Sequence, residues 1–354
     1  MSINGKLKKL LGDNTGIIIS SPENRRYFTR FPSSDGFLLV TSDDAVFFTD
    51  SRYVEAAKKT VSACPIEELT NAVKQLPAYF RERGVKRILF ERDRLFISDF
   101  NKLKGYFEGF ECVIDGSLDE CITALRVVKT KREIDLIKKA QKIAEAAFLH
   151  ILEFIRVGVT EKEIALELDF YMLRNGAEAL SFETIAVSGE NSSLPHGVPS
   201  DKKVQRGDFI TMDFGAVYGG YRSDMTRTVI LKEPSEEQLL VYETVLSAQK
   251  AALCSLKPGV SGMGADKAAR DIINNAGYGA RFGHGTGHGV GLEIHETQAL
   301  SPRSKDILSP GNVITVEPGI YIPGKFGVRI EDMAVITKDG YENLTNCEKE
   351  LICL

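Results

Sequence analysis

The sequence predicts an α+β protein of two domains, and three observations lead to this fold class. At 354 residues the chain is longer than one hydrophobic core usually organises. Strand-like and helix-like stretches alternate up to about residue 123, whereas long amphipathic helices and hairpins with glycine turns follow. In that second part, "RGDFITMDFGA" at 206–216 resembles "PGNVITVEPGI" at 310–320. We therefore expect a small α/β domain over residues 1–123 and a second domain over residues 124–354, built from two related halves.

The amino-terminal part is predicted to be a small α/β domain, and it contains no histidine. Short apolar runs bounded by turn residues predict its strands, and stretches with apolar residues at helical spacing predict its helices. The expected strands lie in 16–20, in 36–50 as a pair that turns at Ser42-Asp43-Asp44, and in 86–91. The expected helices lie in 51–60, 71–84 and 97–108.

Four helices are predicted in the second domain. The first begins near Lys129 and carries apolar residues at helical spacing, with His150 as a packing residue. The second has Thr160 as its N-cap and ends at Gly176. The segments "VGVTEKEI" and "PGVSGMGA" each open a helix about 50 residues before a hairpin, which supports the repeat. The last two helices are expected within 235–256 and 261–276.

Each half of the second domain holds a hairpin in which acidic side chains stand among apolar ones. In the first hairpin, a two-residue loop at Tyr218-Gly219 sets Asp213 directly opposite Asp224, because side chains alternate along a strand. A loop at Gly219-Gly220 makes the two acids diagonal neighbours instead. Both loops leave Asp213 and Asp224 on one face of the hairpin.

The second hairpin carries Glu317 and Glu331, which share a face only if the loop has an odd number of residues or a bulge intervenes. The segment "YIPGKFG" supplies a suitable loop, with Pro323-Gly324-Lys325 at its centre. Two pairs of carboxylates then face inward, one pair from each half.

Four clustered carboxylates need cations or protons. Two carboxylates about 4 Å apart repel by roughly 4 kcal/mol at an effective dielectric constant of about 20. A whole domain is stable by only about 5–15 kcal/mol. Salt bridges from Arg222, Arg227 and Arg329 are one source of positive charge. Divalent metal ions are the other, and oxygen-rich sites favour ions such as Mn, Co or Zn.

The remaining four histidines lie near turn or glycine signals: His196 in "SSLPHGVP", and His284, His288 and His295 in "RFGHGTGHGVGLEIHE". The spacing of His284 and His288 suits a zinc pair on a helix, but five alternating glycines at 283–291 would each cost a helix about 1 kcal/mol. The segment is therefore predicted to be extended, which puts these two histidines about 13 Å apart. We do not expect them to bind one ion together.

Composition and motif spacing exclude several function classes. The glycine run lacks the G-x-G-x-x-G spacing of a dinucleotide loop, and neither a phosphate-binding loop nor the G-x-S-x-G elbow of serine hydrolases occurs. The formal net charge of −4, without a basic block, argues against nucleic acid as a partner. Without an export signal or an apolar run of about 18 residues, we expect a cytoplasmic protein with no membrane partner and with reduced thiols at its six cysteines.

The motifs "MDFGA", "SDMTRT", "GHGVG", "VEPGIY" and "VRIED" resemble those of the pita-bread metallopeptidases, and the likeness covers essentially the whole chain. This family includes Xaa-Pro aminopeptidase, prolidase, methionine aminopeptidase and the metal-free creatinase. The resemblance implies a creatinase/prolidase-type amino-terminal domain and a pita-bread catalytic domain with an internal pseudo-two-fold repeat. It also implies two divalent metal ions per chain, with Mn or Co favoured over Zn.

The metal ligands that the resemblance implies are Asp213, Asp224, His288, Glu317 and Glu331. In this arrangement Asp224 and Glu331 bridge both ions. Asp213 binds one ion, and His288 and Glu317 bind the other. The charge of four carboxylates, about −4, matches two divalent cations.

Further roles follow from the same resemblance. His196 and His295 are implied to hydrogen-bond the substrate and the oxyanion, and Glu317 to carry a proton from water to the leaving nitrogen. The alternative for the two histidines is that they satisfy loop carbonyls.

His284 and Arg329 are implied to orient ligands and the pocket from outside the ligand set, although Arg329 could equally make an ordinary salt bridge. Arg303 in "SPRSKD" is a candidate reader of a free carboxylate directly after proline. The alternative for Arg303 is a solvated loop residue.

The five implied ligands are all present, so the resemblance implies a metal-dependent enzyme. "DMTRT", the extended "GTGHGVGLEIHE" and the amino-terminal domain look more like the proline-directed branch than like methionine aminopeptidase. We expect an Xaa-Pro aminopeptidase that acts on short peptides with proline at the second position, through a hydroxide bound to both ions. The alternative is an Xaa-Pro dipeptidase (prolidase); a methionine aminopeptidase and a non-catalytic binding relative fit less well. Relatives are commonly dimers, which implies a homodimer.

Overall fold

The structure, a computed structural model, describes residues 2–354, and the chain divides into two units. The boundary lies between Arg126 and Val127, at the end of helix α6 (Ser117–Val127). The boundary predicted after residue 123 falls within this helix. Hydrophobic clusters form inside each unit, so each has a core of its own.

The amino-terminal unit is a six-stranded sheet with helices. Its strands are β1 (Thr15–Ile19), β2 (Phe37–Val40), β3 (Ala45–Thr49), β4 (Ile66–Glu68), β5 (Arg87–Phe90) and β6 (Glu111–Val113). Its helices, besides α6, are α1 (Ile3–Leu7), α2 (Pro22–Thr29), α3 (Val54–Thr60), α4 (Ala72–Glu82) and α5 (Ile97–Tyr106).

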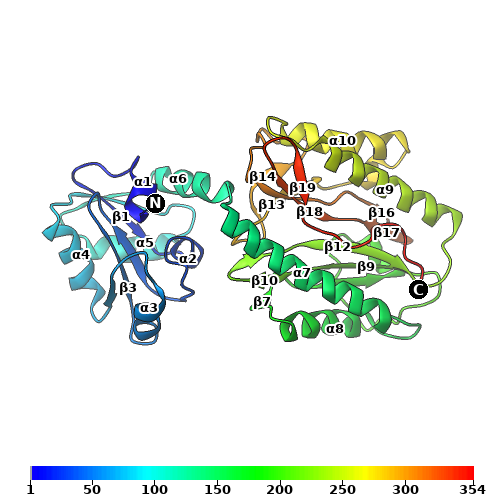
Figure 1. The fold of residues 1–354 in the computed structure, drawn as a ribbon, viewed down its shortest axis with the longest axis horizontal. Coiled ribbons are helices and arrows are strands. Elements are labelled where there is room, and N and C mark those ends of the chain that lie inside the picture. The colour runs from blue at the N-terminus through cyan, green and yellow to red at the C-terminus, as the bar shows by residue number, and fades with distance from the viewer. Residues whose placement is uncertain (1) are drawn as a thin grey trace. The chain divides into compact units, whose positions relative to one another are not determined.

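The strands of this sheet follow the order β4-β3-β2-β1-β5-β6. Strand β1 pairs with β2 antiparallel and with β5 parallel, which confirms the mixed α/β pattern (Figure 1). The predicted pair β2 and β3 turns between Val40 and Ala45, as expected. Two strands, β4 and β6, and three helices, α1, α2 and α6, have no counterpart in the sequence prediction.

All four helices predicted in the second unit are present. They are α7 (Lys131–Phe154), α8 (Glu161–Arg174), α9 (Glu236–Ser255) and α10 (Gly262–Asn275). The side chains of Thr130, Thr160 and Ser235 form capping boxes at the starts of α7, α8 and α9, which explains why these helices begin where they do. His150 lies on α7, hydrogen-bonds Glu167 of α8 and stacks on Tyr171.

The strands of the second unit form antiparallel sheets. In the first half they are β7 (Ala179–Leu180), β8 (Ile185–Ser188), β9 (Phe209–Phe214), β10 (Ala216–Tyr218), β11 (Tyr221–Arg222) and β12 (Met225–Ile230). In the second half they are β13 (Gly287–Gly289), β14 (Glu296–Leu300), β15 (Val313–Val316), β16 (Gly319–Ile322), β17 (Phe326–Arg329), β18 (Asp332–Ile336) and β19 (Tyr341–Asn343).

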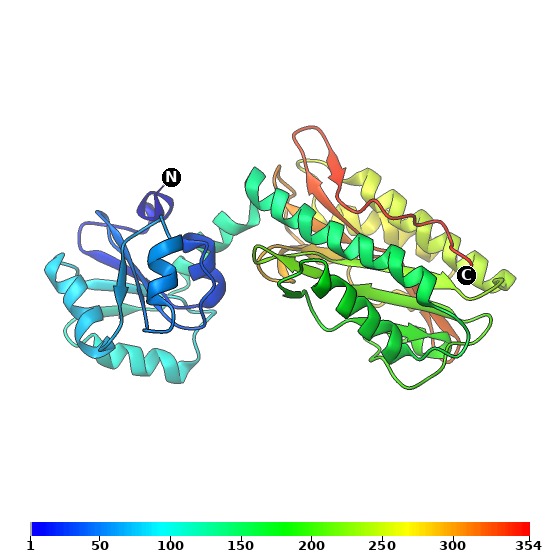
Figure 2. The same cartoon turned by 60° about the horizontal axis from the view of Figure 1, so that its bottom comes forward.

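The two halves repeat one arrangement, as the internal sequence similarity predicts. Strands β8, β9 and β12 pair in the first half, and β13, β15 and β18 pair in the second. One hydrophobic core packs α7 and α8 against β9 and β12, and another packs α9 and α10 against β15 and β18. Helices α8 and α10 lie on opposite sides of the strands in both views (Figures 1 and 2).

The register of the first hairpin selects one of the two predicted loops. Tyr218 pairs with Tyr221, so the loop is Gly219-Gly220. Both glycines have positive φ, 59° and 84°, which the favoured two-residue hairpin turn requires. Asp213 then pairs with Thr226, and Asp224 is its diagonal neighbour.

The second hairpin has the three-residue loop that the sequence predicts. Ile322 pairs with Phe326, so Pro323-Gly324-Lys325 form the loop. The same register continues through β15 and β18, where Val316 pairs with Asp332. Glu317 directly follows β15 and Glu331 directly precedes β18, so the register shared by both ladders sets them opposite each other.

All six cysteines are free thiols, as predicted. In residues 2–354, no helix combines the length and the hydropathy needed to cross a bilayer.

Candidate active site

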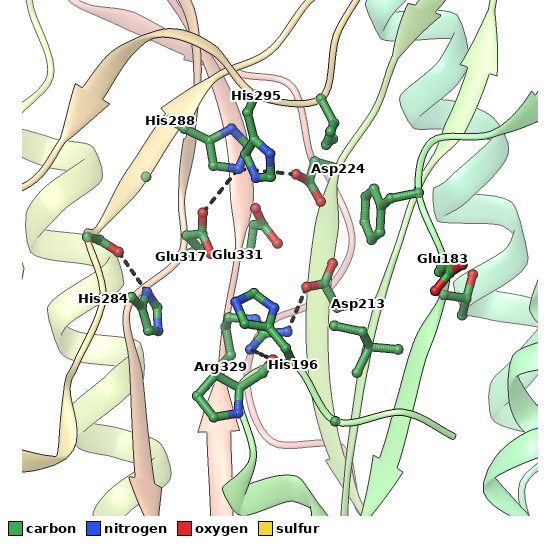
Figure 3. A pocket seen from close by; sticks show the side chains of 18 of the residues that line it. Glu183, His196, Asp213, Asp224, His284, His288, His295, Glu317, Arg329 and Glu331 are labelled. Carbon is green, nitrogen blue, oxygen red and sulfur yellow. Dashed lines mark hydrogen bonds and ion pairs between the residues drawn. The ribbon is translucent and has the colours of Figure 1, made fainter. Parts of the chain in front are cut away.

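A cavity of about 580 Å³ in the second unit collects most of the residues that the sequence singled out. Carboxylates and histidines from both halves line it, and apolar side chains form part of its wall. Figure 3 shows the two aspartates of the first half on one side and the histidines of the glycine-rich segment on the other. The predicted site residues on its lining are His196, Asp213, Asp224, His284, His288, His295, Glu317, Arg329 and Glu331.

His288 faces two of the carboxylates. Its Nε2 lies 3.6 Å from Asp224 Oδ2 and 3.4 Å from Glu317 Oε1. Its Nδ1 lies 3.1 Å from the carbonyl oxygen of Gly289. Because a carbonyl only accepts, Nδ1 carries the proton and Nε2 directs its lone pair at the carboxylates. Three acceptors that face one another need a proton or a metal cation between them.

The glycines around His288 allow this close approach. A Cβ atom on Gly287 would lie 1.9 Å from the carbonyl oxygen of Thr315, and one on Gly289 would lie 2.2 Å from that of Thr297. Only glycine fits between these neighbouring strands. The predicted extended conformation is confirmed for Gly287–Gly289, which is strand β13.

Burial and mutual repulsion act on the carboxylates of the cluster. Burial raises the pKa of Asp224 well above its ordinary value, and the charge of Glu331 raises it further. The pKa of Glu331 is also raised, first by burial and then by Glu317. Burial likewise raises the pKa of Glu317 and lowers that of His288. The cluster therefore favours bound protons or cations over free carboxylates.

The donor set fits divalent metal ions. One ligand atom each of Asp224, His288 and Glu331 lies within 4.8 Å of the others. Asp213 Oδ2 accepts a 2.6 Å hydrogen bond from Arg329, whereas its buried Oδ1 has no hydrogen-bond partner among residues 2–354. An orphaned carboxylate oxygen beside a cluster of acids and one imidazole suits a hard or borderline cation.

A chain of hydrogen bonds through His284, Tyr321 and Arg329 leads to Asp213. The hydroxyl of Tyr321 lies 2.9 Å from His284 Nε2 and accepts a 2.9 Å hydrogen bond from Arg329. Since His284 Nδ1 donates to the carbonyl of Gly285, its Nε2 accepts from the tyrosine. His284 and Arg329 thus orient Asp213 through a residue that the sequence analysis missed. Tyr321 could have been found, because it has the same strand parity as Glu317.

Thr226 is a second residue that the sequence analysis missed. Its hydroxyl donates to Glu331 Oε2 at 2.7 Å and accepts from Arg329 Nε at 3.0 Å. It pairs directly with Asp213, so strand alternation places it on the acidic face. Thr226 therefore links the acids of the two hairpins.

The two histidines expected to touch substrate both line the cavity. His295 precedes β14, and its ring packs edge-on against His288 with centroids 4.4 Å apart. Burial lowers the pKa of His295, and His288 lowers it further. His196 lies in the loop that follows the short helix η1 (Gly189–Ser193). In the same loop, the carbonyl of Pro195 accepts a hydrogen bond from Arg329.

Comparison with known proteins identifies the family. The profile of metallopeptidase family M24 matches residues 135–338, and that of the creatinase/prolidase N-terminal domain matches residues 6–128. The chain belongs to metallopeptidase family M24. It is a metallo-exopeptidase with a creatinase/prolidase-type amino-terminal domain and a pita-bread catalytic domain, as the resemblance implies, and its membership of a metallopeptidase family implies divalent metal ions.

Individual relatives of this M24 peptidase match over nearly their whole length. It is 39% identical to the Xaa-Pro dipeptidase of Pyrococcus furiosus, over 98% of each chain. The solved structure of the Xaa-Pro dipeptidase from Bacillus anthracis superposes with a TM-score of 0.94 at 42% identity, covering 99% of each chain. The X-Pro aminopeptidase from Thermotoga maritima superposes with a TM-score of 0.92 at 39% identity, covering 98% of this chain and 99% of its own.

The arginines that could form salt bridges with the acids differ in the residues that they contact. Arg329 reaches the acidic cluster, where it contacts Asp213. Arg227 instead pairs with Asp332, and Arg222 donates to the carbonyl of Leu292. A single guanidinium neutralises only part of the negative charge of four carboxylates, so other cations have to balance the rest. Arg303 is exposed in a turn and does not line the cavity, and its role as a reader of substrate stays a prediction.

Proposed function

We propose that this M24 peptidase is an Xaa-Pro aminopeptidase, which releases the first residue of peptides that carry proline at the second position. The observation that carries the proposal is the cavity in which carboxylates from two hairpins converge with one imidazole. The proposed metal ligands are Asp213, Asp224, His288, Glu317 and Glu331. When bound there, two divalent ions supply a water of lowered pKa and polarise the scissile carbonyl.

The side chains of the cavity supply the remaining chemistry. We assign to Glu317 the transfer of a proton from water to the leaving nitrogen, because it lines the cavity and burial raises the pKa of its carboxyl. His295 is neutral at pH 7, because its pKa is lowered, and a neutral imidazole can donate one N–H to a developing oxyanion. His196 lines the cavity as well and is the proposed second contact with substrate.

The charge of the cavity favours an aminopeptidase over a dipeptidase. A dipeptidase has to recognise a free carboxylate directly after proline, normally with a cation. Among the described residues that line the cavity there is no lysine, and the one arginine is Arg329. Its guanidinium already donates to Asp213, Tyr321 and the carbonyl of Pro195. A neutral peptide bond after proline needs no such cation.

A dipeptidase (prolidase) is the second candidate, and the relatives support it. The proteins from P. furiosus and B. anthracis are both named Xaa-Pro dipeptidases. For this chain to act in that way, a cation from outside the cavity lining has to bind the carboxylate. A homodimer, which we also propose, would be one source of it.

A panel of three peptides tests the assignment. The protein is loaded with Mn or Co, the proposed native ions, and incubated with Ala-Pro, Ala-Pro-Ala and Met-Ala-Ser. We expect release of alanine from the tripeptide that contains proline. Cleavage of Ala-Pro alone would establish the dipeptidase. Release of methionine alone would contradict the proline-directed function.

A further inference from the structure

A buried ion pair lies behind the active-site loop and outside the cavity lining. Lys129 Nζ is 3.0 Å from Glu296 Oε2, and the two side chains are only 2% and 6% exposed. Two buried charges are costly to desolvate, and their attraction offsets that cost only when further hydrogen bonds hold them in place. Neither residue belongs to the proposed ligands or substrate contacts.

The carboxylate of Glu296 organises the loop that ends in His295. Its Oε1 accepts from the backbone N–H groups of Leu292 at 3.0 Å and Glu293 at 3.4 Å. A Cβ atom on Gly291 would lie 2.4 Å from the same oxygen. The chain from Gly291 to His295 therefore folds tightly around this carboxylate.

The backbone around Lys129 is held in place, and its ammonium group contacts Glu296. Its backbone N–H donates to the carbonyl of Gly311 at 2.8 Å. The side chain of Asn312 donates to the carbonyl of Val127, two residues earlier, at 3.0 Å. Thr130, the next residue, caps helix α7. The backbone on both sides of Lys129 is therefore held in place, by hydrogen bonds to Gly311 and Asn312 and by the start of helix α7.

We propose that Lys129 and Glu296 form a positioning pair, which acts through the loop Gly291–His295 to hold His295 at the cavity. The proposal rests on the proposed contact of His295 with substrate. Without Lys129, the buried carboxylate of Glu296 takes up a proton or turns towards water, and the loop loses its acceptor. His295 directly precedes Glu296, so its ring loses its fixed place.

The effect on catalysis is expected to be moderate and to depend on His295. Loss of a residue that orients an active-site group typically reduces activity about 10–100-fold. We expect Lys129→Met to lower kcat/KM about 10-fold, on whichever peptide the wild type cleaves, with its metal content unchanged. In a His295→Ala background the same substitution should change kcat/KM less than about 2-fold, because residues that act through one group are not additive.

A matched control uses an exposed ion pair of the same length. Lys162 Nζ lies 3.0 Å from Asp201, with side chains 53% and 85% exposed. Lys162→Met should leave kcat/KM unchanged, because an exposed pair contributes little. If Lys129→Met does not fold, the double variant Lys129→Met/Glu296→Met removes both charges and the acceptor of the loop at similar side-chain volume, and it takes the place of the single variant.

Hydrogen exchange supplies a readout that needs no activity. Lys129→Met should speed amide exchange in residues 291–295 and leave helices α9 and α10 unchanged. Unchanged exchange in this loop would overturn the proposal. An equal loss of kcat/KM with and without His295, or a loss of metal, would also overturn it. If the wild type cleaves only Met-Ala-Ser, the proposed proline specificity fails, but the positioning pair is still tested on that peptide.

Discussion

Replacing Arg227 by methionine should strongly destabilise the catalytic unit. The guanidinium is 1% exposed and donates five hydrogen bonds, one of them to Asp332 Oδ1 at 2.8 Å. The other acceptors are backbone carbonyls of Thr226, Glu331, Cys347 and Glu348. Arg227 thus ties the hairpins of both halves to the carboxyl-terminal segment.

The size of the effect follows from these contacts. Removing one partner of a buried ion pair costs about 3–5 kcal/mol, because the other charge stays buried. Lys349, Gln249 and Asn343 still contact Asp332 Oδ2, which reduces the cost of Arg227→Met, whereas four backbone carbonyls lose a donor, which increases it, so we expect a loss of at least about 3 kcal/mol. A loss of about 3 kcal/mol is large beside a domain stability of about 5–15 kcal/mol.

Urea unfolding of Arg227→Met measures this loss, with a probe that reports on the catalytic unit alone, since a protein of two units need not unfold in one step. The control is Lys250→Met, which breaks an exposed pair with Glu350 whose side chains are 49% and 64% exposed. It should cost less than about 1 kcal/mol. If Arg227→Met lost no more than this control, the argument from buried hydrogen bonds would be refuted.

Three further predictions concern the metal centre and the amino-terminal unit. Asp224→Asn should reduce bound metal from two ions per chain to one or none and abolish most activity; elemental analysis that still finds two ions would rule out a bridging role. Tyr321→Phe should lower kcat/KM about 10-fold, because Arg329 loses an acceptor behind Asp213; unchanged kinetics would contradict this. Burial alone would raise the pKa of Asp44, but hydrogen bonds from Arg83, Tyr79 and Thr41 together with the charge of Arg83 lower it below its ordinary value of 3.8. The stabilising effect of Asp44 is therefore present above pH 3.8 and disappears as the pH falls through the lowered value. The difference in unfolding free energy between wild type and Asp44→Asn should therefore shrink in acid, and a difference independent of pH would disprove the coupling.

The alternation of side chains along a strand was enough to predict which acidic residues share a face of each hairpin. A period of two fixes which side chains share a face, so the sequence sufficed to place Asp213 with Asp224. It likewise required the three-residue loop that sets Glu317 opposite Glu331. The long amphipathic helices were predictable for a similar reason, since their caps and spacing are local.

Contacts between distant segments could not be predicted in this way. Lys129 and Glu296 are 167 residues apart, and no local pattern marks them as partners. Arg227 follows Asp224 by three residues and Arg329 precedes Glu331 by two, yet only tertiary packing decides which acid each one meets. Short elements such as β4 and β6 were missed because three residues carry too little periodicity.

We propose that two divalent ions bind between the hairpins of the two halves. The most direct test is a crystal structure of the Mn-loaded protein with anomalous diffraction data. We expect two anomalous peaks in the cavity, with the carboxylates of Asp224 and Glu331 in contact with both and His288 Nε2 on one. A single peak, or peaks away from these side chains, would contradict it.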